Sequence, residues 1–246
     1  MVDGQGAPLL EARGIVLAFG SNRVLDGVDV TVRAGEAVGI VGPNGAGKTT
    51  LLAALSGSLR ISAGAIRLRG QDVTALDAAR RCRLGVARSH QVPRPFSGMT
   101  TFENVLTAAM HGGSFSRAEA CDRAIDALDV CGMTAVANRR AETLGLLDRK
   151  RLELTRALAT APELLLLDEI GGGLTDGEAS ELVGTIRTLR DRGITIVWIE
   201  HIVHVLVQVA QRLICMDAGR IIADGAPDAV LADATVVDAY LGGQRA

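Results

Sequence analysis

Two segments near the start of the chain alternate apolar and polar residues, which is the pattern of a β-strand with one buried face. They span Leu9–Phe19 and Val24–Val32 and are joined by a turn at Gly20–Asn22. One face of the second segment is built from valines, Val24, Val28, Val30 and Val32. A third, uniformly apolar segment, Ala37–Val41, runs directly into a glycine-rich sequence. We therefore predict N-terminal antiparallel strands followed by a buried strand.

The spacing of apolar residues becomes helical after this strand. Lys48–Ser58 predicts a helix whose apolar face carries Leu51, Leu52 and Leu55. The interval Thr100–Ala161 is mainly helical in pattern, beginning with Phe102, Val105, Leu106 and Ala109. Within it, Ser116 followed three residues later by Glu119 predicts the start of another helix.

A further helix is predicted from about Arg149 to Thr160. Its apolar side is expected to carry Leu154, Ala157, Leu158 and Ala161, and its polar side Arg149, Glu153 and Arg156. After it, short apolar runs separated by helical segments return at Leu164–Leu167, Ile194–Ile199 and Leu213–Met216. Such runs are typical of a parallel sheet covered on both faces. The chain therefore reads as one α/β domain, with a core from residues 1–91 and 162–246 and an inserted helical subdomain at residues 92–161.

Composition narrows the class of protein. With 246 residues and 48% apolar residues, the chain can bury a sizeable core. A net charge of −2 with mixed signs gives no basic stripe, so we expect no nucleic-acid partner. The four cysteines are scattered, which favours free thiols in a cytosolic protein. No apolar run reaches the ~20 residues of a membrane-spanning helix, and Met1–Pro8 lacks the layout of a secretion signal.

The most specific motif is the glycine-rich segment after the third strand. It reads Gly42, Pro43, Asn44, Gly45, Ala46, Gly47, Lys48, Thr49 and Thr50, and it lies between a predicted strand and a predicted helix. This is the phosphate-loop pattern, in which backbone amides surround phosphate oxygens. Lys48 is placed to reach the β- and γ-phosphates and Thr49 to ligate magnesium. The sequence thus predicts ATP and Mg²⁺ as ligands, within a P-loop NTPase core.

A second motif is an acidic pair that follows four leucines. Leu164–Leu167 predicts a buried strand, and Asp168 and Glu169 come at its carboxyl end, where α/β sheets place their ligands. Asp168 can hold magnesium, and Glu169 can act as general base toward the attacking water. Acids often follow buried strands, so the assignment depends on the phosphate loop. About 120 residues separate Lys48 from Asp168, more than compact kinases or small GTPases place there.

With these motifs in this order, the whole chain resembles the ATP-binding subunit of an ABC transporter. The resemblance implies that Phe19 stacks on adenine, that Gln91 touches magnesium and joins core to helical subdomain, and that His201 contacts the γ-phosphate. Phe19 could instead be a core aromatic, and His201 a packed or solvated histidine. His204 lies three residues beyond His201, but without a further ligand nearby we reject a metal pair.

Two places depart from the family pattern. The signature, usually Leu-Ser-Gly-Gly-Gln, aligns with Leu144, Gly145, Leu146, Leu147 and Asp148. In the loop after Glu169, Ile170 replaces a common proline and Thr175 a common aspartate. In the family each signature completes the ATP site of the opposite subunit. We therefore expect a heterodimer with a different ATPase subunit and unequal sites; a homodimer that tolerates a loose signature is the alternative.

Within the family, several short sequence segments are most similar to those of importers of branched-chain amino acids, urea and amides. Three short segments and the tail carry this likeness, namely Leu25–Val28, Gly173–Thr175, Ile199–His201 and Asp238–Gly242. The resemblance implies two membrane permease subunits, an indirect solute-binding receptor, and a peripheral place on the cytoplasmic face of the inner membrane. Alternatives are an ATPase of another transport system, such as lipid or polysaccharide export, a soluble ABC-type ATPase, a phosphoryl-transfer enzyme or an ATP-gated module that does not hydrolyse.

Overall fold

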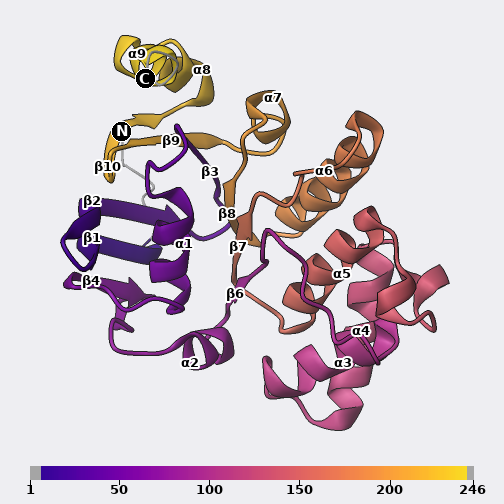
Figure 1. Cartoon of the computed structure of the whole chain (residues 1–246). Helices are drawn as coiled ribbons and strands as arrows, with labels where there is room; N and C mark the ends of the chain where they lie inside the picture. The colour runs from indigo at the N-terminus through magenta and orange to yellow at the C-terminus, as the bar shows by residue number, and fades with distance from the viewer. Residues whose placement is uncertain (1–6, 243–246) are drawn as a thin grey trace, which may run out of the picture.

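The computed structural model describes residues 7–242, which form two β-sheets and a group of helices (Figure 1). The N-terminal sheet has the strand order β2-β1-β4-β5, and every pairing in it is antiparallel. Its strands are β1 (Pro8–Phe19), β2 (Asn22–Arg33), β4 (Ala63–Leu68) and β5 (Gln71–Asp72). The predicted N-terminal antiparallel pair is confirmed, while β4 and β5 were not predicted. The prediction that Met1–Pro8 carries no secretion signal falls almost wholly outside the described residues.

The second sheet has the strand order β10-β9-β3-β8-β7-β6. Its strands are β3 (Ala37–Val41), β6 (Val86–Arg88), β7 (Leu164–Asp168), β8 (Thr195–Ile199), β9 (Arg212–Asp217) and β10 (Arg220–Gly225). All neighbours pair in parallel except β10, which folds back on β9. The predicted mostly parallel sheet is confirmed. Because Ile199 pairs with both Ile40 and Asp168, the carboxyl ends of β3, β8 and β7 lie side by side.

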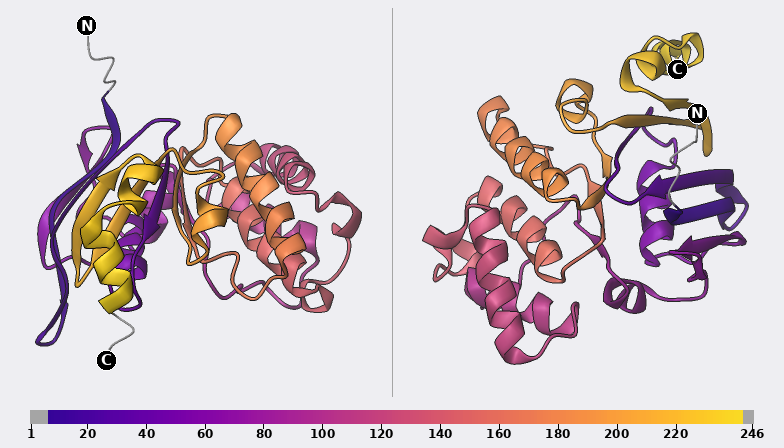
Figure 2. Two further views of the ribbon diagram at one scale, coloured as in Figure 1. Left: turned by 90° about the horizontal axis from the view of Figure 1, so that it is seen from above. Right: turned by 180° about the vertical axis from the view of Figure 1, so that it is seen from behind.

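Helices lie on both faces of this sheet and beyond its edges (Figure 2). Six of them connect or follow its strands: α1 (Lys48–Ser56), α2 (Ala78–Arg83), α6 (Asp176–Asp191), α7 (Val203–Leu206), α8 (Pro227–Leu231) and α9 (Ala234–Gly242). The other three, α3 (Thr101–His111), α4 (Arg117–Val130) and α5 (Leu146–Ala159), pack on one another far from the N-terminal sheet. They fall within the predicted helical subdomain, whose boundaries remain a prediction.

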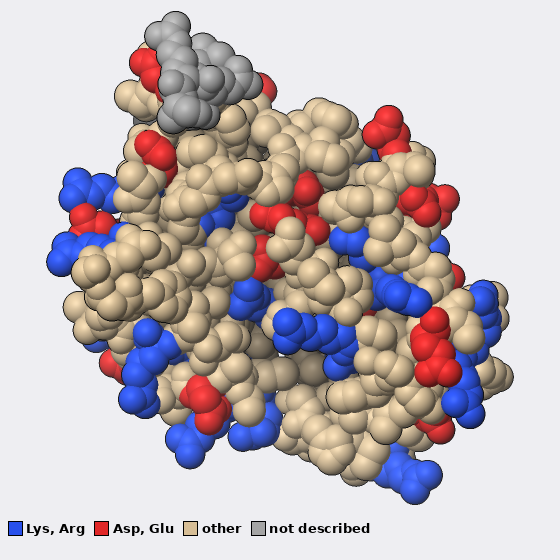
Figure 3. Space-filling model, in the orientation of Figure 1, with Lys and Arg blue, Asp and Glu red and all other residues tan. Residues whose placement is uncertain are grey.

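On the face seen in Figure 3, Lys and Arg side chains lie interspersed with Asp and Glu. Between residues 7 and 242, no helix has both the length and the apolar character that crossing a bilayer requires. All four cysteine thiols are free, and Cys131 and Cys215 are buried.

Helix α5 differs from its prediction in three ways. It begins at Leu146, three residues early, because Gly145 has an extended backbone and serves as the N-cap. Ala161, expected on the apolar side, is exposed beyond the helix end with a φ of 54°. Glu153, expected on the polar side, is buried, and its carboxylate accepts hydrogen bonds from Arg94 N at 2.5 Å and from Arg156 Nη1 at 3.1 Å. By contrast, Ser116 and Glu119 form the predicted capping box at the start of α4.

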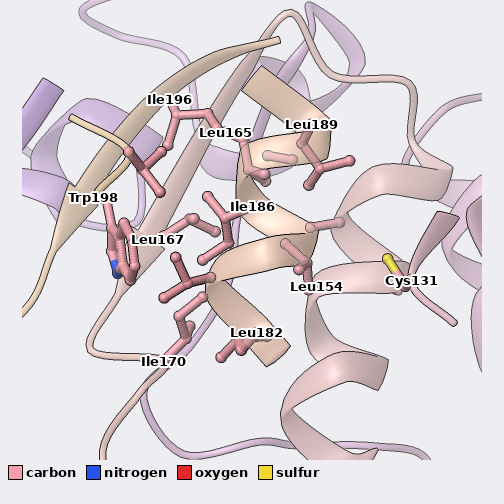
Figure 4. Close-up of a cluster of buried hydrophobic side chains, with 14 of the residues drawn as sticks. Cys131, Leu154, Leu165, Leu167, Ile170, Leu182, Ile186, Leu189, Ile196 and Trp198 are labelled. Atoms are coloured by element: carbon pink, nitrogen blue, oxygen red, sulfur yellow. The ribbon is translucent and has the colours of Figure 1, made fainter. Parts of the chain in front are cut away.

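The sheet is held between two aliphatic layers, as expected for strands buried on both faces. On one face Leu165 and Leu167 of β7 form a buried cluster with Leu182, Ile186 and Leu189 of α6 (Figure 4). The opposite face of the same strands packs against Leu51 and Leu55 of α1. These layers fix the strand ends from which the candidate site is built.

We expect Ile186→Ala to lower the free energy of unfolding by about 2–5 kcal/mol, because it leaves a cavity between α6 and the sheet. Ile186 has no exposed surface. Urea denaturation followed by circular dichroism measures the change. Thr188→Ala is the control on the exposed side of the same helix and should stay within about 0.5 kcal/mol. Equal losses in the two variants would contradict the packing described.

Candidate functional site

The glycine-rich loop between β3 and α1 has a backbone that only glycine adopts readily. The φ values of Gly42, Gly45 and Gly47 are 141°, 84° and 98°. A side-chain carbon at Gly42 would lie 2.0 Å from the carbonyl oxygen of Met216. The loop is thus pressed against β9, and a cavity of about 180 Å³ lies beside it. The cavity is lined by Val24, Glu169 and the residues from Asn44 to Thr50.

Lys48 closes the loop on itself. Its Nζ donates hydrogen bonds to the carbonyl oxygens of Gly42 at 2.6 Å and Pro43 at 2.9 Å. The side chain is buried, and burial lowers the pKa of Lys48, an effect opposed by Glu169, Cys215 and Asp168. The Lys48 ammonium donates hydrogen bonds only to neutral carbonyl oxygens, so an anionic ligand in the cavity can replace them with stronger, charge-assisted hydrogen bonds.

Asp168 is fixed at the end of β7 by two neighbours. Its Oδ1 accepts a hydrogen bond from Thr49 Oγ1 at 3.1 Å, and its Oδ2 pairs with Arg88 Nη2 at 2.7 Å. The structure therefore brings the two predicted magnesium ligands on α1 and β7 into contact. Sequence reasoning missed Arg88, which ends the short strand β6 and carries no motif of its own.

The Glu169 carboxylate contacts two other predicted site residues, His201 and Gln91. Its Oε1 lies 2.7 Å from Nε2 of His201, and its Oε2 accepts a hydrogen bond from Nε2 of Gln91 at 2.5 Å. Glu169 also has a φ of 45°, which is uncommon for a residue with a side chain and is typical of strained functional sites. Its backbone N–H donates to the carbonyl oxygen of Ile199 at 2.9 Å, which continues the sheet by one residue.

A buried carboxylate, Glu200, holds the backbone on both sides of the contact between Glu169 and His201. One of its oxygens accepts a hydrogen bond from the N–H of Gly171 and the other from that of His201, both at 3.1 Å. Burial raises the pKa of Glu200. Sequence reasoning missed this residue, although an acid that directly follows a buried strand was the signal used for Asp168.

Lys150 was also missed. It lies in the first turns of α5 and is buried; burial lowers its pKa, while Glu200 and then Glu169 oppose that change. Two signals could have found it. The chain contains only two lysines, Lys48 and Lys150, and Lys150 falls four residues before Leu154 on the apolar stripe of its helix.

Phe19 lies at the end of β1, with 53% of its surface exposed. The alternative of a packed core aromatic is therefore wrong. Its exposed ring can offer one face to a planar ligand, and stacking on adenine stays a prediction. His204 is exposed, and no group of three or more His, Cys, Asp or Glu residues suited to a metal occurs among residues 7–242.

The signature segment surrounds the start of α5. Leu144 is buried, Gly145 is the N-cap, and Leu146 is exposed, while Leu147 and Asp148 are half-buried in the first turn. A side-chain carbon placed at Gly173 would lie 3.4 Å from Leu146 Cδ2, so the signature and the loop after Glu169 are neighbours within the chain.

Both departures in the loop after Glu169 have a structural explanation. Ile170 is 2% exposed and belongs to the core beside α6 (Figure 4). Thr175 caps α6, and its hydroxyl and N–H form a capping box with Glu178. Ile170 thus contributes to the buried core, and Thr175 satisfies backbone N–H groups at the start of α6.

Comparison with known families finds two matching models. Residues 25–171 match the model described as ABC transporter, and residues 220–246 match that of the branched-chain amino acid ATP-binding cassette transporter. The second match covers β10, α8 and α9 and extends past the described residues.

Curated proteins match over nearly the whole chain. The high-affinity branched-chain amino acid transport ATP-binding protein LivG of Salmonella typhimurium is 36% identical, over 96% of this chain and 98% of its own length. The corresponding protein BraF of Pseudomonas aeruginosa is 34% identical over the same shares. A probable LivG of Methanocaldococcus jannaschii is 30% identical over 95% of this chain and 97% of its own length.

Solved structures agree. The crystal structure of a nucleotide-free ATP-binding cassette from an ABC transporter superposes with a TM-score of 0.86 at 29% identity, over 95% of this chain and 99% of that one. The ADP conformation of an ATP-binding cassette gives the same TM-score at 30% identity, over 96% and 100%.

Proposed function

Because this chain belongs to the ABC transporter family and is an ATPase of that family, we propose that it drives import of branched-chain amino acids or related small polar solutes. Two observations support the solute class. The similarity to LivG and BraF proteins extends over nearly the whole length of both partners. The C-terminal residues 220–246 also match the model specific to branched-chain amino acid cassettes.

ATP binds, in this proposal, with its phosphates in the cavity lined by Asn44–Thr50 and its adenine on Phe19. The Lys48 ammonium exchanges the carbonyl oxygens of Gly42 and Pro43 for phosphate oxygens. The glycines keep the loop amides free of side chains, so that these N–H groups and the N-terminus of α1 face the phosphates.

The residues around Asp168 fit magnesium, which prefers oxygen ligands and keeps several waters and phosphates in its shell. Thr49 Oγ1 and Asp168 Oδ1, only 3.1 Å apart, are two such oxygen atoms. Gln91 is held near them by its hydrogen bond to Glu169, the residue that follows Asp168. When bound, the ion neutralises charge on the phosphates. Thr49, Asp168 and Gln91 are the residues that would hold it.

Hydrolysis is assigned to Glu169, and the contact of Glu169 with Gln91 and His201 is the observation that carries this proposal. These residues lie far apart in sequence, yet their side chains converge beside the phosphate loop. The Glu169 carboxylate accepts a proton from the attacking water. Gln91 and His201 hold the carboxylate in place, and His201 is the group proposed to reach the γ-phosphate.

A second ATPase subunit completes each site in this proposal. Gly145 lacks the hydroxyl that the family signature supplies, and Leu147 adds bulk where the family has glycine. The site that this chain completes for its partner is therefore impaired, while its own Lys48 and Glu169 are intact. We infer a heterodimer with a different ATPase subunit.

The permease subunits are proposed to contact the segment that follows Gln91. Three apolar side chains there are exposed, Val92 at 67%, Phe96 at 45% and Met99 at 38%. Exposed apolar side chains that gather on one segment are typical of an interaction site. When the two ATPases close, this segment moves the membrane subunits that it contacts. The chain is accordingly proposed to be peripheral, on the cytoplasmic face of the membrane.

Transport by the complete system tests the solute class. The chain, its partner ATPase, the permeases and the receptor are reconstituted in vesicles, and ATP-dependent uptake of labelled leucine and of labelled urea is compared. We expect leucine uptake, which stops when ATP is omitted. Uptake of urea with none of leucine would contradict branched-chain amino acids as the solute and favour the related small polar solutes, while leaving the ATPase intact.

A further inference from the structure

The C-terminal helix α9 reaches back to the phosphate loop. The backbone N–H of Gly42 donates a hydrogen bond to the hydroxyl of Tyr240 at 2.8 Å. We propose that Tyr240 is a positioning residue of this loop, through which the C-terminal segment fixes Gly42 and hence Lys48. This inference rests on the proposed role of Gly42–Thr50 in binding nucleotide.

Gly42 is the first residue after β3, and its peptide groups are held from both sides. Its N–H meets Tyr240, and its carbonyl oxygen accepts the hydrogen bond from Lys48 Nζ at 2.6 Å. On the third side, the carbonyl of Met216 leaves no room for a side chain. A backbone N–H at such a crowded place needs a partner, since an unpaired buried donor is unfavourable. Tyr240 provides that partner from a distant part of the chain.

Tyr240 is well placed to hold the loop because its own helix is anchored. Val236, one turn earlier on α9, and Val230 on α8 are each 2% exposed and belong to the core. Burial raises the pKa of Tyr240, so its hydroxyl stays protonated and neutral in the working pH range. The contact is therefore a neutral hydrogen bond that changes of pH near neutrality leave in place.

The same segment also shares an apolar hollow with the chain that follows His201. Tyr240 and Val237 of α9 line an apolar hollow together with Val203, which lies two residues after His201. The C-terminal segment thus contacts the phosphate loop and lies across an apolar hollow from the chain that follows His201. This placement gives α9, which belongs to the part matched by the branched-chain amino acid model, a role in the ATP site itself.

The contact matters most once nucleotide is bound. Lys48 then leaves the Gly42 carbonyl for the phosphates, and Tyr240 remains as the side chain that holds this peptide. Loss of the hydroxyl allows the loop to adopt other positions before ATP binds. The effect falls on affinity and leaves the proton transfer at Glu169 untouched, so KM for ATP rises while kcat is nearly constant.

Tyr240→Phe removes only the hydroxyl and tests the proposal. Binding of mant-ATP to the whole chain is measured by fluorescence, and KM and kcat are measured in the assembly with its partner ATPase. We expect Kd and KM to rise by about 3- to 10-fold, the effect of one lost neutral hydrogen bond, with kcat within about twofold. Val237→Ala is the matched control on α9, because it removes apolar contact and keeps the hydroxyl.

Three outcomes contradict parts of the account separately. If Tyr240→Phe binds mant-ATP as tightly as the wild type, the positioning role is wrong. If Val237→Ala weakens binding as much as Tyr240→Phe, general packing of α9 is responsible and the role of the hydroxyl is wrong. If the wild-type chain fails to bind mant-ATP, the nucleotide site proposed above fails first. Urea denaturation of both variants shows that the fold is retained.

Discussion

Replacing Glu169 with glutamine is expected to lower ATP turnover by about 100- to 10,000-fold, the usual contribution of a general base. The amide cannot accept a proton from water, yet it has the same shape and can keep a hydrogen bond to Gln91 or His201. ATP binding should therefore persist. Phosphate release and mant-ATP binding, measured on the same preparation, separate the two effects.

Glu163→Gln is the matched control for this variant. Glu163 precedes the same strand, β7, at its opposite end, and its carboxylate pairs with Arg69 at the surface. It should leave turnover unchanged. If Glu169→Gln keeps more than about half of the wild-type turnover, another group removes the proton and the assignment of Glu169 is wrong.

Replacing Lys48 with alanine is expected to weaken ATP binding by about 10- to 100-fold or more, because hydrogen bonds to charged groups contribute about 1.5–3 kcal/mol each. The only other lysine, Lys150, lies on α5, so no second lysine of the loop can replace it. In the free protein the variant loses two contacts to backbone carbonyls of the loop. Isothermal titration with ATP and magnesium measures the loss.

Arg13→Ala serves as the control for loss of a cation. Its side chain is 75% exposed and pairs with Glu11 on the surface of β1, where ion pairs contribute little. ATP affinity should match that of the wild type. Unchanged affinity in Lys48→Ala would mean that the nucleotide phosphates bind elsewhere than in the Gly42–Thr50 loop.

Long apolar runs and glycine-rich motifs were predictable from sequence because their signals are local. Ala37–Val41 was predicted with the same bounds that the structure shows, and Lys48 begins α1 as expected. The strands β4, β5, β6 and β10 were missed. They have six, two, three and six residues and owe their strand conformation to neighbours across the sheet.

The polar contacts of the site were only partly predictable. Glu169 was singled out by its place at the end of a buried strand, and Gln91 and His201 through the family resemblance. The structure places the three together. Arg88 required the fold, because its importance comes from its ion pair with Asp168 on the neighbouring strand. Lys150 and Glu200 had local signals in the sequence, but their burial near other charges became visible only in the fold. The same holds for Tyr240, whose partner Gly42 lies at the other end of the sequence.

Helix α5 shows the limit of periodicity arguments. A period of 3.6 residues placed Glu153 on the solvent side, yet the segment around Arg94 folds over it and supplies a backbone N–H. Ala161 has the correct period for the apolar side but lies beyond the helix end. Periodicity describes one face of a helix and cannot show which other segments cover the rest of it.

We propose that this chain is an ATPase whose own site is competent and is completed by a different subunit. Steady-state phosphate release by the purified chain, wild type and Glu169→Gln, alone and mixed with its partner ATPase, tests this proposal. We expect activity only in the mixture, with most of it lost in Glu169→Gln. Full activity of the wild-type chain alone, with ATP-dependent homodimers, would contradict the unequal heterodimer, and no phosphate release in either case would contradict the proposed catalytic site.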